Sequence, residues 1–256
     1  MIKPNKKTAR IIYRGPSILD GSPIVAIMTM ASRNTKTGAM AQVYIIADSD
    51  LNPLDINRLG LDFGICGDCK LKGKPAPDKL KGTATERGCY VTLFQGPLIV
   101  WKNYRAGKYA PIAPADLAEY GRGENIRLGA YGDPAAIPAA ITRALISKAA
   151  GHTGYTHQIN IIATDARAEL ASACMISADN LTEARNHWQA GRRTFRVIQN
   201  IDEIVAGEIV CPATSEGGKK THCNDCRLCS GSESVGKNIA AVFHGGGRGH
   251  AARALI

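Results

Sequence analysis

The sequence predicts an α/β protein: a partial (β/α) barrel with an N-terminal β-rich segment and Cys-rich metal-binding loops. Short apolar strands and helical segments alternate from Gln42 onward, which is typical of parallel strands joined by crossover helices. An apolar content of 45% in 256 residues is ordinary for a folded protein, so a core can form without disulfides. We expect a basic tail and β-rich segment at 1–41, then a barrel-like domain at 42–256 with metal-binding loops 64–90 and 211–231.

The first half of the chain contains strands and helical segments separated by turn signals such as Gly15-Pro16. The clearest helix spans 138–150, because a proline stands at its start, Gly151 follows its end and apolar residues recur at helical spacing. The expected strands lie at 11–13, 23–30, 42–47 and 125–131, and the expected helices lie within 48–60 and at 97–106, 114–120 and 138–150.

The second half continues the alternation. The helix at 182–190 is expected to end at Gly191, since glycine favours helix C-termini. The last strand, at 238–244, leads into a glycine run at 245–249, which could form a phosphate-binding nest, although no helix long enough for a dinucleotide fingerprint follows. One expected strand lies within 155–162 and the others at 171–177, 194–198, 208–212 and 238–244, and the expected helices lie at 165–170 and 182–190.

Four cysteines near the C-terminus form the strongest motif. Cys211, Cys223, Cys226 and Cys229 lie within nineteen residues, and the last three have CxxCxxC spacing. A CxxC pair places two sulfurs on one tight turn, and both zinc and iron–sulfur clusters use such pairs. The pattern predicts one metal site with four thiolates, a ligand set that suits zinc and iron alike. Cys174, among apolar neighbours, is expected to be a small buried hydrophobic residue instead.

A second group of cysteines lies upstream and has three members. Cys66 and Cys69 form a CxxC pair, and Cys89 follows after nineteen residues, directly before Tyr90. The loop at 64–88 shows no periodicity, and a loop of this length in a compact domain indicates function or disorder. Three protein ligands leave one coordination position open, which a catalytic metal needs and a structural one does not. We therefore expect the two cysteine groups to serve different purposes.

Polar residues stand at the ends of several expected strands, where the active sites of (β/α) barrels lie. Each also has a structural explanation. Asp133 precedes a proline and suits a turn, Asp179 could be the N-cap of the next helix, and His157 could be a satisfied core histidine. His244 could simply end its strand. The residues at these strand ends are Tyr131, Asp133, His157, Gln158, Asp179, Asn180, Cys211 and His244.

The net charge of +10 is unevenly distributed. The first fourteen residues hold five basic residues and no acid, and the loop at 70–87 holds six basic residues and two acids. Such an excess favours nucleic acid or a phosphorylated small molecule as a partner, and the alternative is a solvated surface. The chain shows no apolar leader and no run near the ~20 apolar residues of a membrane span, so we expect a cytoplasmic protein with reduced thiols and no membrane contact.

This order of elements resembles the partial barrel of radical SAM enzymes. The resemblance rests on the strand at 42–47, a three-cysteine loop that ends in Cys89-Tyr90, a helix, and a strand that ends in Gly-Asp-Pro at 132–134. In that family, three cysteines hold a [4Fe–4S] cluster whose open iron binds the amino and carboxylate groups of S-adenosylmethionine. The family motif is CxxxCxxC, so the cysteine spacing of this chain departs from it.

The resemblance implies that Cys66, Cys69 and Cys89 hold such a cluster and that Asp133 lies near S-adenosylmethionine. It also implies an auxiliary cluster or a zinc ion at the four downstream cysteines. The pattern is similar, too, to proteins encoded by tailed bacteriophages, which would place the chain in a host cytoplasm. The cofactor-binding candidates are Tyr90, Tyr131, Asp133, His157 and Asp179.

Three functions are consistent with these patterns. The first is an iron–sulfur enzyme, radical SAM-like, that acts on a nucleotide or nucleic acid. The second is a zinc protein that binds nucleic acid and has no catalytic activity. Two observations oppose it: an aromatic content of 5% provides few rings on which bases could stack, and the sequence shows no helix–turn–helix motif. The third is a structural or regulatory protein in which bound metal ions only stabilise loops.

Overall fold

The apolar runs of the N-terminal half form a six-stranded mixed sheet. β1, β2 and β3 pair antiparallel in that order, and β3 continues into two parallel neighbours, β5 and β6. β1 and β2, from the expected N-terminal segment, thus lie in the same sheet as β3 and β5. In spatial order the strands are β4 (Ala110–Pro111), β1 (Arg10–Pro16), β2 (Pro23–Thr29), β3 (Ala41–Ala47), β5 (Asn125–Tyr131) and β6 (Gly151–Thr153).

The C-terminal half forms a second sheet of five strands, all of them parallel. This agrees with the alternation of short strands and helices in this part of the sequence. The computed structural model describes residues 7–30, 35–243, 249 and 250. In spatial order the strands are β10 (Glu208–Val210), β11 (Asn238–Val242), β9 (Thr194–Ile198), β8 (Met175–Ala178) and β7 (Tyr155–Thr156).

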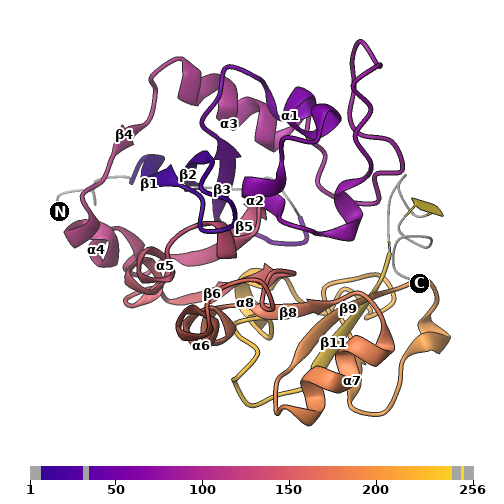
Figure 1. Ribbon diagram of the computed structural model, residues 1–256. Helices are drawn as coiled ribbons and strands as arrows, with labels where there is room; N and C mark the ends of the chain where they lie inside the picture. Colours follow the sequence, from indigo (N-terminus) through magenta and orange to yellow (C-terminus); the bar gives the residue numbers. More distant parts are fainter. Residues whose placement is uncertain (1–6, 31–34, 244–248, 251–256) are drawn as a thin grey trace.

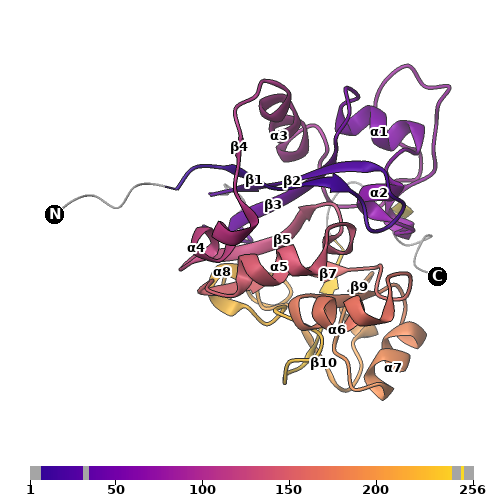
Figure 2. The ribbon, with the colours of Figure 1, turned by 60° about the vertical axis from the view of Figure 1, so that its left-hand side comes forward.

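Helices cover both sheets. α1 and α3 lie on one side of the six-stranded sheet and α4 and α5 on the other, while α6 and α7 flank the five-stranded sheet (Figures 1 and 2). None of the helices in the described ranges is long and apolar enough to cross a bilayer. The helices are α1 (Pro53–Leu59), α2 (Phe63–Cys66), α3 (Gly96–Arg105), α4 (Leu117–Gly121), α5 (Ala139–Ile146), α6 (Thr164–Ala173), α7 (Leu181–Gln189) and α8 (Cys223–Cys226), with 3-10 turns at Lys70–Lys72, Pro114–Asp116, Pro134–Ala136 and Ile201–Glu203.

Gly154 is the point at which the chain passes from one sheet to the other. It separates β6 from β7, and its backbone N–H donates to the carbonyl of Cys229 at 3.1 Å. A Cβ at this position would lie 2.7 Å from Sγ of Cys174 and 3.1 Å from Cβ of Leu128. The two sheets therefore meet at a residue that has no room for a side chain.

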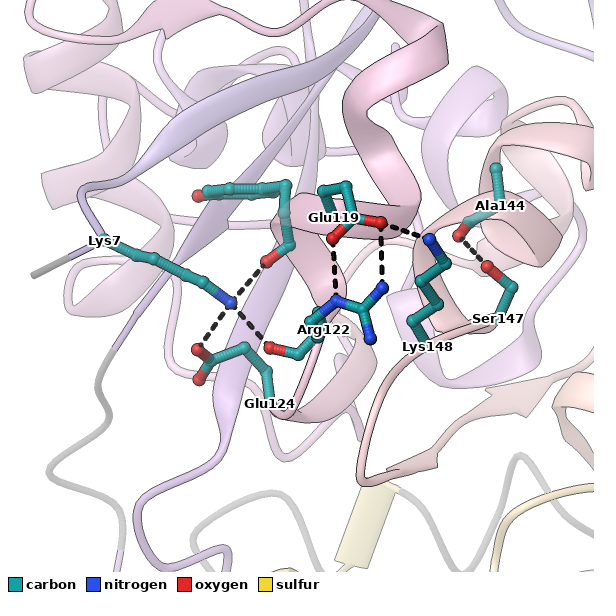
Figure 3. A network of polar contacts seen from close by, with 8 residues as sticks. Lys7, Glu119, Arg122, Glu124, Ala144, Ser147 and Lys148 are labelled. Atoms are coloured by element: carbon teal, nitrogen blue, oxygen red, sulfur yellow. Dashed lines mark hydrogen bonds and ion pairs between the residues drawn. The ribbon is translucent and has the colours of Figure 1, made fainter. Parts of the chain in front are cut away.

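A cluster of polar contacts fastens the start of the described chain to α4 and the end of α5 (Figure 3). The Lys7 ammonium group donates to the carbonyl of Arg122 at 2.6 Å and forms an ion pair with Glu124 at 3.0 Å. The Glu119 carboxylate accepts from the Arg122 guanidinium at 2.7 Å and also contacts Lys148. These groups are largely solvated, so the cluster positions the N-terminal strand rather than adding much stability.

Most expected elements are present, and the differences have local causes. The expected strand at 171–177 is wrong in its first half, because α6 extends to Ala173 and only Met175–Ala178 pairs as a strand. The expected helix at 138–150 is shorter, since it ends at Ile146. The short strands β4 and β6 and the single turn α8 were not expected; each has four residues or fewer and thus no readable periodicity.

The sheets form two separate hydrogen-bonded units, so a closed barrel is not shown. The alternation of strands and helices predicts parallel pairing, but it does not predict whether the sheet breaks, as it does at Gly154. His244 and the glycine run at 245–249, except Gly249, lie outside the described residues.

Candidate functional site

The loop that carries the first cysteine group is held in place by one buried side chain. Asn57, at the end of α1, donates to Oδ2 of Asp62 at 2.7 Å and to the carbonyl of Lys72 at 2.9 Å. Its Oδ1 accepts from the backbone N–H of Ala84 at 3.0 Å. Because these partners lie before, within and near the end of the loop, Asn57 orders the segment that the sequence shows as irregular.

Lys72 fixes the turn between the first two cysteines. Its ammonium group donates to the carbonyl of Gly67 at 2.5 Å and lies 3.7 Å from Oδ1 of Asp62. It also stands over the Phe63 ring, 5.1 Å from the centroid. These contacts turn one of the basic residues of the loop inward, so this lysine is part of the scaffold of the site.

Cys66, Cys69 and Cys89 gather at the carboxyl edge of the parallel strands. The Cys69 N–H donates to the Cys66 carbonyl at 3.3 Å, and the Cys89 N–H donates to the Leu71 carbonyl at 2.8 Å. Cys69 and Cys89 pack against Leu71 and against Phe243, which follows β11 of the second sheet. Burial raises the pKa of the Cys66 thiol, and negative charges, including those of Cys69 and Cys89, raise it further. The three thiols therefore share one electrostatic environment.

Gln158 packs against the CxxC turn from the end of β7. Its amide nitrogen donates to the Cys66 carbonyl at 3.0 Å, and its Oε1 accepts from the Asp68 N–H at 3.3 Å. Gly67 has φ 58°, and a Cβ there would lie 2.1 Å from Oε1 of Gln158. The close approach of this amide therefore requires glycine between the two cysteines.

Three of the predicted strand-end residues meet beside these thiols. The Asp133 carboxylate accepts from the N–H of Ala135 at 3.0 Å and from the N–H of His157 at 2.9 Å. Nε2 of His157 lies 3.5 Å from Oδ1 of Asp179, and Lys70 lies 3.7 Å from the other oxygen. Asp133 is thus both a turn residue, as expected, and the anchor of the histidine backbone.

Asp179 and His157 do not have the purely structural roles that the sequence allows them. Asp179 is not the N-cap of α7, because Asn180 takes that role and its Oδ1 accepts from the Glu183 N–H at 2.9 Å. Asparagine is as good an N-cap residue as aspartate, so the neighbouring residue can cap the helix in place of Asp179. His157 is only partly buried and faces a carboxylate, so it is not an ordinary core histidine.

The His157 imidazole connects the carboxylates to the thiols. Burial lowers its pKa, but the negative charge of Cys69 and hydrogen bonds with Asp179 and Cys69 outweigh that effect and raise it well above the ordinary value. The imidazole, which can carry a proton, thus lies between a thiol of the first group and the Asp179 carboxylate.

Tyr131 ends β5 with a buried hydroxyl that has no hydrogen-bond partner among the described residues. Burial raises its pKa well above the ordinary value, and the negative charges of Cys66 and Asp62 raise it further. The charge of Cys66 thus acts on this hydroxyl, and a buried polar atom without a hydrogen bond is rare enough to be a candidate for function. Tyr90, also a candidate, is exposed and hydrogen-bonds to Arg127 at 2.7 Å.

The second cysteine group lies deeper, on the five-stranded sheet. Cys211 follows β10, Cys223 and Cys226 begin and end α8, and Cys229 accepts from Gly154 through its carbonyl. Burial raises the pKa of the Cys229 thiol to about 12, with the neighbouring thiolates also raising it and a hydrogen bond from Tyr155 lowering it. Three of these cysteines are buried, and two of them pack with Met175, Ile239 and Ala241.

Both groups gather thiols, but neither shows coordination geometry. Within the part of the chain that the structure describes, no set of three or more His, Cys, Asp or Glu side chains is placed so that it could hold a metal ion. Cys174 is fully buried, as expected, and lies directly after α6.

The structure adds functional candidates that sequence reasoning missed. Asn57 and Lys72 organise the loop, and Arg127 is buried between the two cysteine groups. The sequence does contain a sign that Arg127 is unusual, because it is the one charged residue in the strand NIRLGAY. The other two have none, since their roles depend on partners that are brought close only by folding.

Comparison of the chain with protein-family models, with curated proteins and with solved structures gave no match.

Proposed function

We propose that the chain is an iron–sulfur enzyme of radical SAM-like type, with a [4Fe–4S] cluster at Cys66, Cys69 and Cys89 and a second metal centre at the four downstream cysteines. The observation that carries the proposal is the convergence of these three thiols with Asp133 and His157 at the carboxyl ends of parallel strands. In parallel α/β folds this edge is where reactions take place. The two sheets would then be the halves of an open (β/α) barrel.

The donor set fits a cluster in its chemistry. Thiolates are the usual ligands of iron–sulfur clusters, and three of them leave an iron open to a further ligand. The buried hydroxyl of Tyr131, which has no hydrogen-bond partner among the described residues, is a donor that a bound group would engage. The side chains would have to turn from their present positions to reach one cluster, since they do not now form a coordination set.

Cys66, Cys69 and Cys89 would hold such a cluster, and the chemistry that it would supply is one-electron transfer. The residues of this chain have separate tasks. The Asp133 carboxylate holds the backbone of His157, and Asp179 orients the His157 imidazole. The imidazole can hold or release a proton beside the thiols. The exposed basic part of the loop, including Lys79 and Lys81, would attract a nucleotide or nucleic-acid substrate.

Metal analysis with a visible spectrum, on protein purified without oxygen, tests the proposal. A brown protein with several irons per chain, which cleaves S-adenosylmethionine when reduced, is the expected result. A colourless protein with one or two zinc ions would contradict it, because zinc has no redox chemistry.

A second candidate function is a zinc-stabilised protein that binds nucleic acid without catalysis. The observation that favours it is a group of exposed apolar and aromatic side chains in and after the basic loop: Leu80, Tyr90 and Phe94, which are 98%, 58% and 64% exposed. Aromatic rings beside positive charge are typical of single-strand binding. Under this candidate, binding of an oligonucleotide should weaken steeply as salt rises, while zinc content stays constant.

A further inference from the structure

Arg127 is a buried arginine without a carboxylate partner in the described part of the chain. It lies in the middle of β5 with 7% of its surface exposed. Its Nη2 donates to the Tyr90 hydroxyl at 2.7 Å, and its guanidinium stands 5.2 Å from the centroid of the Tyr155 ring. A buried cation is normally paired with an anion, because hydroxyls and rings offset only part of the desolvation.

Each of the two tyrosines that contact Arg127 is linked to a different cysteine group. Tyr90 directly follows Cys89 of the first group. Tyr155 hydrogen-bonds to the thiol of Cys229 in the second group, and its ring packs on Phe195 with 4.6 Å between centroids. Arg127 thus forms the middle of a continuous path between the two sites.

One of the groups that favour the charge of this arginine, Cys223, belongs to the four-cysteine group. Burial opposes the charge of Arg127, but the nearby Tyr90, Tyr155 and Cys223 favour it and raise its pKa. A divalent zinc ion bound by four thiolates has a net negative charge, as do all-thiolate iron–sulfur clusters. A metal centre at the four downstream cysteines would therefore supply the counter-charge that the described residues do not provide.

We propose that Arg127 is the shared charge partner of the two cysteine sites and that, through Tyr90, it links occupation of the four-cysteine site to the placement of Cys89. The inference rests on the proposed function in requiring metal at both sites. Arg127 is a positioning residue: it contacts Tyr90 and Tyr155, which in turn hold the cysteine segments. Loss of the guanidinium should therefore loosen both sites, while loss of the Tyr90 hydroxyl should loosen only the first.

The test compares Arg127→Gln and Tyr90→Phe with wild type in the full metal-loaded chain. Metal release to a chelator is followed in parallel with alkylation of each cysteine by N-ethylmaleimide, read by mass spectrometry. In Arg127→Gln, Cys89 and Cys229 should both react about tenfold faster, the factor expected for losing one charge-assisted hydrogen bond. In Tyr90→Phe, only the first site should change. Tyr13→Phe is the matched control, because it removes a tyrosine hydroxyl that bonds to Pro16 at 2.7 Å.

Acceleration at one site alone in Arg127→Gln, or wild-type reactivity of Cys89 in Tyr90→Phe, would overturn the linkage. Tyr90 is 58% exposed, so its variant should fold even where the arginine variant does not. Failure of the proposed function looks different: wild-type protein would then contain no iron. If the wild type is loaded with metal and Arg127→Gln changes only one site, the proposed function stands and the linkage is removed.

Discussion

The two cysteine sites differ in their surroundings more than in their ligands. The first lies at the carboxyl edge of the strands, between a loop ordered by Asn57 and the charged pair of His157 and Asp179. The second packs against apolar side chains of the five-stranded sheet, and the positive charges of Arg127 and Lys36 act on its Cys223. Ionisable side chains therefore surround the first group, whereas apolar packing dominates around the second. Under the proposed function, this difference assigns chemistry to the first group and stability to the second.

The largest expected effect is that of Cys226→Ser on the second site. Structural metal sites contribute on the order of 10–16 kcal/mol of apparent binding free energy, so losing one of four ligands should lower Tm by about 10 °C or more. Thermal melting followed by circular dichroism measures this. Cys174→Ala serves as the control, because it removes a buried thiol that belongs to neither site. A Cys226→Ser variant that melts like wild type would rule out the four-cysteine site.

Glu208→Gln should destabilise the same half of the molecule by a smaller amount. Glu208 and Arg196 are buried and joined by two hydrogen bonds of 2.9 and 2.7 Å, and Glu208 begins β10, the strand that Cys211 follows. Leaving the arginine without its partner should cost about 3–5 kcal/mol in the free energy of unfolding, measured by urea denaturation. Glu119→Gln, in the solvated cluster of Figure 3, should leave the urea midpoint unchanged. Equal effects of the two substitutions would contradict the assignment of the buried pair.

Cys69→Ser should leave the fold intact and change only the first site. Asn57 and Lys72 hold the loop without a metal, so Tm should fall by no more than about 3 °C, roughly 1 kcal/mol. The iron content should fall by one cluster, and S-adenosylmethionine cleavage should be lost. Loss of metal from both sites, or unfolding, would show that the first site is structural after all.

The smallest effect is a pH dependence that arises outside both sites. Burial lowers the pKa of His187 below its ordinary value of 6.5, with Arg192 also lowering it and Glu183 opposing. Because the unfolded chain then binds the proton more tightly, stability from this residue is complete above about pH 6.5 and falls as the pH drops below it. Urea midpoints at several pH values between 7 and 5 should show this decline, and His187→Gln should reduce it. An unchanged slope in the variant would assign the decline to other groups.

The sequence predicts the repeating part of this fold and much of the first site. The strands at 125–131 and 194–198 have the expected bounds, since a run of apolar residues between turn signals is a local property. The convergence of Asp133, His157 and Asp179 follows from parallel strands, whose ends meet at one edge. Neither statement requires knowledge of distant contacts.

Other features depend on contacts that no local pattern contains. The end of α6 was misplaced because Ala171 to Ala173 suit a helix and a buried strand equally. Asn57 is an ordinary helix residue until Lys72 and Ala84 fold against it. The break between the sheets depends on how closely Gly154 and Leu128 pack, which the sequence does not state.

The tight contact between Gly67 and Gln158 also limits how the two positions can change in evolution. The two positions are 91 apart in the chain, yet the amide of one occupies the space in which the other would have a side chain. In descendants of this gene, any residue larger than glycine at position 67 should therefore appear only together with a shorter residue in place of Gln158. Such a paired exchange could be traced through a lineage long after the intervening sequence had diverged.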